Sequence, residues 1–129
     1  MIVLDASAAF ELLMQTEAGQ GLAARLGHFA HVHAPHLLDV EVASTLRRVV
    51  ASGTTSLKRA AQALDDLRIM RIERHAHVLY LPRIWELRHN FSSYDACYLA
   101  LTEMLDGTLL TRDKAMARAR LRYGTVEMI

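Results

Sequence analysis

The chain opens with Met1-Ile2-Val3-Leu4-Asp5-Ala6-Ser7, a short apolar run followed directly by a helix-start signal. The apolar part is rich in β-formers and too short for a helix, so it predicts a fully buried strand. Asp5 belongs to the residue types that cap helix N-termini, and we expect the helix to run through Phe10 and Leu13. A buried strand that leads straight into a helix is typical of α/β folds.

The rest of the chain continues this alternation of strands and helices. Alternation over one domain implies a parallel sheet of four or five strands with helices on both faces. We expect the single domain to span residues 1–129. The further strands are expected at residues 31–34, 69–72, 108–110 and 126–129. The further helices are expected at residues 16–26, 38–50, 57–67, 82–90, 94–105 and 113–122.

Local signals set several of these boundaries. Ser56 is expected to cap a helix whose buried face carries Leu57, Ala60, Ala61, Leu64 and Leu67. Pro82 is best placed at the first position of its helix, where proline is tolerated. Ser92 or Ser93 begins the strongly periodic helix that follows.

The bulk properties exclude several classes of protein. The 129 residues carry a net charge of +1, so no global positive field points to a nucleic-acid partner. One cysteine, Cys97, excludes an internal disulfide and a cysteine-based zinc site, and its place on an apolar stripe predicts a small buried side chain. No apolar run is long enough to span a membrane, and acids interrupt any signal-peptide pattern. A cytoplasmic protein is expected.

Four acidic residues stand where a parallel sheet would bring them together. Asp5 and Asp113 follow predicted strands, Asp95 opens a helix, and Glu41 lies on the flank of another helix. Strand carboxyl ends and helix N-termini share one edge of such a sheet. Two carboxylates ~4 Å apart cost roughly 4 kcal/mol at an effective dielectric near 20, so a divalent cation would favour the gathering. Helix capping explains the three aspartates equally simply, Asp95 as part of a capping box with the serine three residues earlier.

Periodicity leaves open whether Glu41 or Asp39 faces this site, because the two side chains point nearly opposite ways. Oxygen ligands without His or Cys suit Mg²⁺ or Mn²⁺, and Mg²⁺ takes one or two protein carboxylates directly. Metal-assisted hydrolysis of a phosphodiester is the chemistry that fits such a pocket.

Several motifs resemble the PIN-domain ribonucleases, and more narrowly the VapC toxins of bacterial VapBC toxin–antitoxin pairs. The resemblance covers nearly the whole chain, and its strength lies in the order and spacing of the motifs. These are Ile2-Val3-Leu4-Asp5-Ala6-Ser7, residues 35–48 around Glu41-Val42-Ala43, Arg83-Ile84-Trp85-Glu86-Leu87-Arg88-His89-Asn90, Tyr94-Asp95-Ala96-Cys97-Tyr98-Leu99-Ala100-Leu101, and Leu109-Leu110-Thr111-Arg112-Asp113.

The resemblance implies a Mg²⁺- or Mn²⁺-dependent endoribonuclease with an α/β/α sandwich fold. It implies that the catalytic and metal-binding acids are Asp5, Glu41, Asp95 and Asp113, and so favours Glu41 over Asp39. Ser7 and Thr111 correspond to hydroxyl positions beside the acids. The implied partners are an RNA substrate, a cognate antitoxin and a second copy in a homodimer, with no membrane. One or two metal ions remain open.

Two alternatives from other classes are a non-catalytic PIN-fold binding module and a receiver-type phosphoacceptor domain. All four acids are present, which disfavours the first, and the Tyr94-Asp95-Ala96 helix start does not fit the second. A stable aspartyl-phosphate formed from a small phosphodonor would favour the receiver.

Other residues receive less specific interpretations. Arg112 is a candidate RNA phosphate contact, because an acidic pocket needs nearby cations to hold a polyanion. Trp85, Tyr94 and Tyr98 are expected in the core or in dimer contacts. The histidines at 31, 33 and 36 suggest zinc, but we interpret His31 and His33 as a pair near a surface turn, and His75 and His77 as having no special role.

Overall fold

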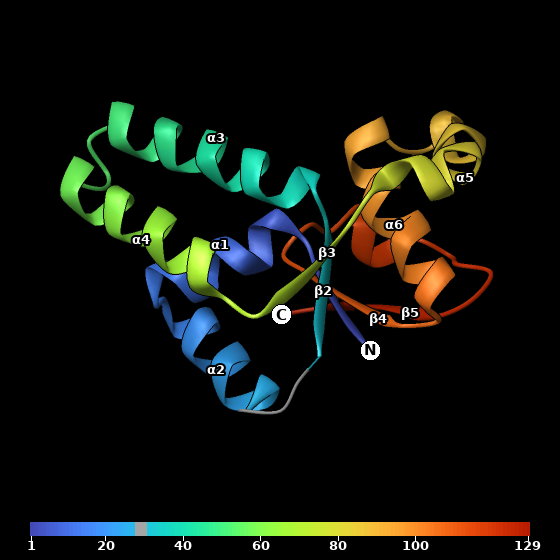
Figure 1. The fold of residues 1–129 in the computed structure, drawn as a ribbon, viewed down its shortest axis with the longest axis horizontal. Coiled ribbons are helices and arrows are strands. Elements are labelled where there is room, and N and C mark those ends of the chain that lie inside the picture. The colour runs from blue at the N-terminus through green and yellow to red at the C-terminus, as the bar shows by residue number, and fades with distance from the viewer. Residues whose placement is uncertain (28–30) are drawn as a thin grey trace.

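A five-stranded parallel sheet forms the centre of the molecule in the computed structural model, which describes residues 1–27 and 31–129 (Figure 1). The strand order is β3-β2-β1-β4-β5, and every neighbouring pair is parallel. This confirms the α/β class. The strands are β1 (Ile2–Leu4), β2 (Val32–Pro35), β3 (Ile72–His75), β4 (Thr108–Thr111) and β5 (Thr125–Met128).

Helices cover both faces of the sheet and complete the expected α/β/α sandwich (Figure 1). One layer holds the antiparallel pair α3 and α4 together with α1 and α2, and the other holds α5 and α6. The helices in the described residues are α1 (Ala6–Met14), α2 (Glu17–Leu26), α3 (Leu37–Ala51), α4 (Leu57–Ile69), α5 (Leu81–Glu86) and α6 (Ser93–Leu105).

The core lies between β1 and the helices on each side of it. Val3 and Leu4 are fully buried, as a central parallel strand requires. α6 packs on β1, β2 and β4, and eight consecutive residues of this helix are buried. Cys97 is one of them, which confirms the prediction of a small buried side chain, and burial raises the pKa of its thiol to about 11. The strand that carries Asp5 and the helix that carries Asp95 are therefore held rigidly together.

The third strand lies three residues later than predicted. α4 continues to Ile69, and β3 occupies Ile72–His75 in register with β2. Arg74 binds the carboxylate of Asp39 and the carbonyl oxygen of Leu67, which ties the strand to α3 and α4. An edge strand with polar side chains shows no apolar run. The apolar residues at the end of the preceding helix therefore resembled a strand more closely than β3 does.

The buried face of α4 also differs from the prediction. Ala60, Ala63 and Leu67 face the core, at spacings of three and four residues. Leu57 is 74% exposed and Leu64 lies at the surface. The large apolar side chains misled the assignment, because small alanines allow α4 to pack closely on its neighbours.

Residues 113–122 do not form the expected helix. Only one 3₁₀ turn, Met116–Arg118, follows Asp113, and the rest of the segment has no regular secondary structure before β5. The backbone N–H of Arg122 donates to Glu103 of α6, 2.8 Å away, which holds the segment against that helix. The chain must also return to pair β5 beside β4, which leaves little length for a helix. Met116 is the one buried side chain of the turn, so a longer helix would have no apolar face to bury.

The three aromatic residues expected in the core or in dimer contacts differ in their burial. Tyr98 is buried, as a core contact should be. Trp85 and Tyr94 are 66% and 61% exposed, so neither is a core residue of this chain, and their role in dimer contacts stays a prediction. Within the described residues no helix has both the length and the apolar character needed to cross a bilayer.

Candidate active site

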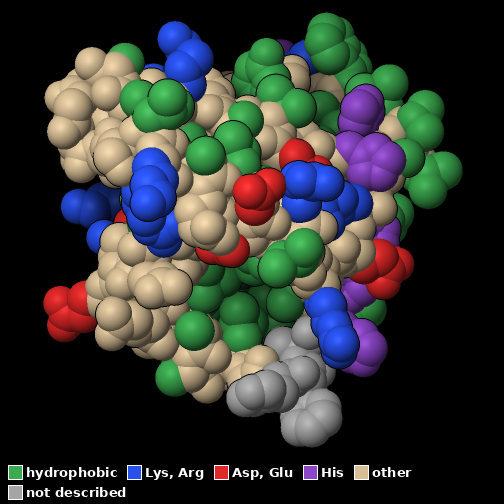
Figure 2. All heavy atoms as spheres, turned by 60° about the vertical axis from the view of Figure 1, so that its left-hand side comes forward, with side chains coloured by type: hydrophobic (Ala, Val, Ile, Leu, Met, Phe, Trp, Pro, Cys, Tyr) green, Lys and Arg blue, Asp and Glu red, His purple; other side chains and the backbone are tan. Residues whose placement is uncertain are grey.

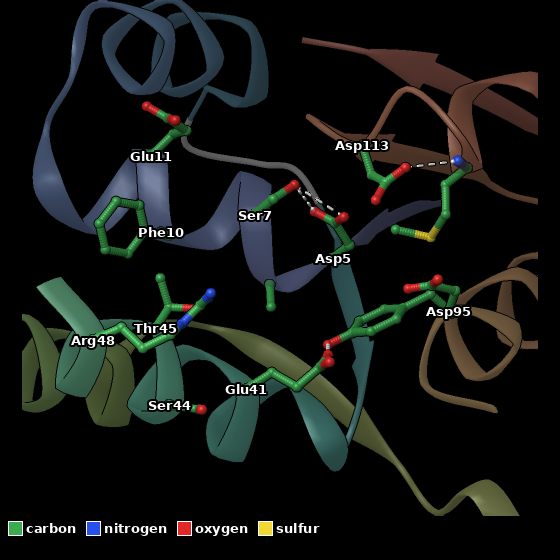
Figure 3. A pocket seen from close by; sticks show the side chains of 13 residues that line it. Asp5, Ser7, Phe10, Glu11, Glu41, Ser44, Thr45, Arg48, Asp95 and Asp113 are labelled. Atoms are coloured by element: carbon green, nitrogen blue, oxygen red, sulfur yellow. Dashed lines mark hydrogen bonds between the residues drawn. The ribbon is translucent and has the colours of Figure 1, made fainter. Parts of the chain in front are cut away.

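All four predicted acids line one pocket of about 400 Å³ at the carboxyl edge of the sheet (Figure 3). Each comes from a different place in the chain. Asp5 joins β1 to α1, Glu41 lies in α3, Asp95 lies in the first turn of α6, and Asp113 follows β4. The parallel topology thus brings together side chains that are up to 108 residues apart in sequence.

Asp5 is the most firmly held of the four. It is 2% exposed, and its carboxylate accepts hydrogen bonds from the N–H of Ala8 at 2.8 Å and from the hydroxyls of Ser7 at 2.7 Å and Thr111 at 2.5 Å. The bond to Ala8 is an N-cap, so the capping role and the place in the pocket coexist. Ser7 and Thr111 therefore fix the orientation of this carboxylate.

The same two hydroxyls connect Asp5 to the loop after β4. The oxygen of Thr111 accepts from the N–H of Asp113 at 2.9 Å, and the oxygen of Ser7 accepts from the N–H of Arg112 at 2.8 Å. One oxygen of Asp113 accepts from Ala115 and Met116 and so caps the short turn. Bonds from both sides thus position the first and last acids relative to each other.

Asp95 enters the pocket from the start of α6. The hydroxyl of Ser92 accepts from the N–H of Asp95 at 3.1 Å, so the serine caps the helix as predicted. The carboxylate of Asp95 points toward Asp5 and Asp113 (Figure 3). The serine performs the capping, which leaves the acid available to the pocket.

The structure places Glu41, and not Asp39, in the pocket. Asp39 forms a bidentate ion pair with Arg74, with distances of 2.7 and 2.9 Å, and does not line the pocket. Glu41 accepts a 2.6 Å hydrogen bond from the hydroxyl of Tyr98, a residue of α6. This agrees with the choice that the resemblance implied.

Burial and mutual repulsion disfavour the ionised forms of Asp5, Glu41 and Asp95. Burial is the largest cause that raises the pKa of Asp5, of Glu41 and of Asp95. Neighbouring acids raise each pKa further, with Asp113 acting on Asp5 and on Asp95. Hydrogen bonds from Thr111 and Tyr98 act in the opposite direction and favour the ionised forms. The pocket therefore gathers negative charge at a cost that a cation would relieve.

The donor set fits a hard divalent cation. Every acidic ligand offers oxygen, and Mg²⁺ or Mn²⁺ prefers oxygen. Among the described residues the four carboxylates surround the pocket and do not form a tight group of three within 4.8 Å. Mg²⁺ keeps several waters and takes few direct protein ligands, so a pocket of this width suits a hydrated ion.

The raised pKa values predict how the metal-free protein responds to pH. The folded state holds its protons to higher pH than the unfolded chain does. The contribution of these groups to the free energy of unfolding should therefore fall as pH rises from the ordinary pKa of each group, 3.8 for Asp5 and 4.5 for Glu41, through the raised folded values. Urea unfolding of wild type and Asp95→Asn between pH 4 and pH 7 in the presence of a chelator isolates the contribution of Asp95. The variant should gain stability relative to wild type as pH rises, and a difference between the two that does not grow with pH would contradict the prediction.

The basic side chain in the pocket lining is Arg48 and not the predicted Arg112. The side chain of Arg112 donates to the carbonyl oxygen of Ile129 and lies 3.7 Å from Glu11, which does line the pocket, so a contact of Arg112 with RNA stays a prediction. Arg48 lines the pocket from α3, away from Asp95 and Asp113 in this view (Figure 3). Sequence reasoning missed Arg48, although it stands seven residues after Glu41 and so shares its helix face.

The same face of α3 contributes two further polar side chains that the sequence analysis did not select. Ser44 and Thr45 follow Glu41 by three and four residues and line the pocket between it and Arg48. The guanidinium of Arg48 donates to the hydroxyl of Thr45 at 3.2 Å. Helical spacing from Glu41 was the signal that could have identified all three residues.

Comparison with known proteins assigns this arrangement to a class. A family model described as "PIN domain" matches residues 2–121, and the chain belongs to the PIN-domain family. Within that family it is of the VapC type. It is 41% identical over 113 residues to Ribonuclease VapC9 of Mycobacterium tuberculosis, which covers 88% of this chain and 86% of that one. It is 40% identical to Ribonuclease VapC1 of the same organism, over 91% of this chain and 89% of the other.

Solved structures share the fold at much lower sequence identity. VapBC2 from Rickettsia felis, bound to a DNA fragment from its promoter, covers 99% of this chain and 98% of its own at a TM-score of 0.67 and 14% identity. PAE2754 from Pyrobaculum aerophilum covers 97% of this chain and 87% of its own at a TM-score of 0.66 and 16% identity. These likenesses support the sandwich fold and carry no information on individual residues.

Proposed function

We propose that this chain is the toxin of a type II toxin–antitoxin pair, an endoribonuclease that hydrolyses RNA with Asp5, Glu41, Asp95 and Asp113 as its metal-binding catalytic acids. The observation that carries the proposal is the single pocket in which the four acids meet, in a chain of the VapC type. Bound Mg²⁺ or Mn²⁺ would supply a Lewis acid that activates water and offsets charge on the phosphodiester.

The protein's own residues prepare the pocket for this chemistry. Ser7 and Thr111 hold Asp5, and Tyr98 holds Glu41, through hydrogen bonds that favour the ionised carboxylates. Orientation fixed before the ligand binds avoids reorganisation during the reaction. The pocket provides acids and hydroxyls, and a water activated by the bound ion would be the nucleophile.

The RNA strand must be held by local cations. Acidic and basic side chains are interspersed on the face shown in Figure 2, which agrees with a net charge of +1 and offers no broad basic surface. Arg48 is the basic side chain of the pocket lining. An RNA phosphate bound beside Arg48 would direct the RNA strand toward the acids at the other end of the pocket.

Arg48→Gln should weaken RNA binding more than it slows the chemical step. We expect KM for RNA to rise by about tenfold, with a smaller change in kcat, because a phosphate contact loses about 1–3 kcal/mol at most. The dependence of binding on salt should also become less steep. Arg47→Gln is the matched control, since Arg47 is exposed and does not line the pocket. Equal effects of the two substitutions would contradict the placement of RNA beside Arg48.

RNA cleavage by the purified protein tests the proposed activity directly. We expect end-labelled RNA to be cut at internal positions in Mg²⁺ or Mn²⁺, and cutting to stop with a chelator. Incubation with acetyl phosphate tests the receiver alternative in the same preparation. Stable aspartyl-phosphate without RNA cleavage would replace the nuclease by a receiver, and neither product on a broad RNA set would favour the non-catalytic binding module.

Partner proteins are the second part of the proposal. We propose a cognate antitoxin and a homodimer, and exposed apolar side chains near the start of α6 support a protein partner there. Val40, Leu81, Trp85 and Tyr94 are all more than half exposed, and a groove lined by Val40, Leu81 and Tyr94 runs between α3 and α5. Light scattering on Trp85→Ser and wild type would test the dimer, which the substitution should dissociate.

A further inference from the structure

Two histidines and a glutamate meet on one face of the sheet, away from the acidic pocket. In the parallel register of β2 and β3, His33 stands opposite Glu73, and His75 follows two residues later on the same side. The Nδ1 of His33 and the Nε2 of His75 are 3.0 Å apart. None of the three residues lines the acidic pocket.

The ligand atoms of the three side chains have separations close to those around a tetrahedral ion. Glu73 Oε2 lies 3.6 Å from His33 Nδ1, and its other oxygen, Oε1, lies 3.8 Å from His75 Nε2. Bonds of ~2.0–2.2 Å at tetrahedral angles place neighbouring ligand atoms roughly 3.3–3.6 Å apart. The observed range of 3.0 to 3.8 Å brackets that value. Within the described residues, this is the group of three metal-ligating side chains whose atoms all lie within 4.8 Å of one another.

His33 is built into the fold and does not belong to a surface turn, which corrects the expectation from sequence. It is 5% exposed, and its second ring nitrogen, Nε2, is buried without a hydrogen-bond partner in the described residues. Without a metal, one of the two facing ring nitrogens, His33 Nδ1 or His75 Nε2, must donate a hydrogen bond to the other. A bound cation would accept the lone pairs of both nitrogens.

We propose that His33, Glu73 and His75 form a zinc site that fastens the edge strand β3 to β2. Two imidazoles and one carboxylate select Zn²⁺ over Mg²⁺, so this site and the acidic pocket would bind different ions. Glu73 is 67% exposed on its side chain, so solvent can reach the site and water can fill the fourth position. The ion would join the edge strand β3 to β2 through side chains as well as through the backbone ladder.

Zinc titration of tag-free, metal-stripped protein tests this proposal. We expect saturable binding of one Zn²⁺, a higher unfolding temperature with Zn²⁺, and tetrahedral absorption bands when Co²⁺ replaces it. Glu73→Gln and His75→Gln should each weaken binding by at least about tenfold. Glu73 is a surface residue, so that variant keeps the fold even if a histidine variant does not.

Two controls separate this site from the rest of the chain. His89→Gln removes an exposed histidine outside the group and should leave zinc affinity unchanged. Asp5→Asn with Asp95→Asn disables the acidic pocket and should also leave zinc affinity unchanged, whether or not the protein cleaves RNA. Zinc affinity that is insensitive to Glu73→Gln and His75→Gln, or lost in the double aspartate variant, would overturn the proposal, as would absence of saturable binding.

Discussion

Asp95→Asn should reduce RNA cleavage by at least about a hundredfold. Loss of a residue that only hydrogen-bonds to a metal ligand costs up to about a hundredfold, and the loss of an acid that binds the metal should cost no less. Asp95 opens α6 and points its carboxylate into the pocket, where it faces Asp5 and Asp113 (Figure 3). Asparagine keeps the shape of the side chain but removes the charge that would attract Mg²⁺. The N-cap formed by Ser92 uses the backbone N–H of residue 95, so the substitution leaves it intact.

The same substitution should stabilise the metal-free protein. Burial and the charge of Asp113 raise the pKa of Asp95, so the ionised group is unfavourable in the folded state. Removing it should raise the free energy of unfolding by on the order of 1 kcal/mol or less, because the half-buried pocket is partly screened by solvent. Loss of activity with gain of stability distinguishes a functional acid from a structural one.

Cleavage rates at saturating Mg²⁺ and urea unfolding in a chelator measure the two effects. Asp65→Asn is the matched control, since Asp65 is an exposed aspartate of α4 paired only with Arg68 in the described residues. It should change neither quantity appreciably. Cleavage by Asp95→Asn at the wild-type rate would remove Asp95 from the catalytic set.

Gly19→Ala should destabilise the fold by about 3 kcal/mol or more, the upper range for overpacking a close contact. Gly19 is a buried residue of α2, and a Cβ built on it would lie 1.9 Å from the carbonyl oxygen of Glu11 in α1. That neighbour is backbone and cannot rotate away. The two helices would have to separate, and α1 carries Ser7 and is capped by Asp5.

Gly21→Ala in the same helix is a sharp control. Nothing lies within 4 Å of a Cβ at Gly21, and alanine favours a helix interior over glycine by about 0.5–1 kcal/mol. One substitution should therefore lower the thermal midpoint and the other should raise it. If both variants moved the midpoint in the same direction, the close approach of α1 and α2 would be wrong.

Where local chemistry decides the structure, the sequence alone predicted it. The apolar run before Asp5 indicated β1, and Ser92 indicated the start of α6, because each signal is complete within a few residues. The predicted helix at 113–122 failed for the opposite reason. Its local pattern is helical, but the return of the chain to β5 and the bond from Arg122 to Glu103 override it.

The candidate site shows the same division. Asp5, Asp95 and Asp113 stand at junctions of strands and helices, so a parallel sheet alone implied that they converge. The choice of Glu41 over Asp39 required either the family resemblance or the structure, in which Arg74 of a distant strand binds Asp39. Arg48 was missed because helical spacing from Glu41 was not followed along α3.

This chain's residues determined by themselves the α/β class, the strand–helix junctions and the acids that those junctions carry. Only the tertiary structure decided which residues of α3 face the pocket, where the last segment runs, and that His33 meets His75 across β2 and β3. The physical reason is range. Capping and periodicity act over one or two helical turns, whereas strand register and helix docking depend on contacts between residues far apart in the chain.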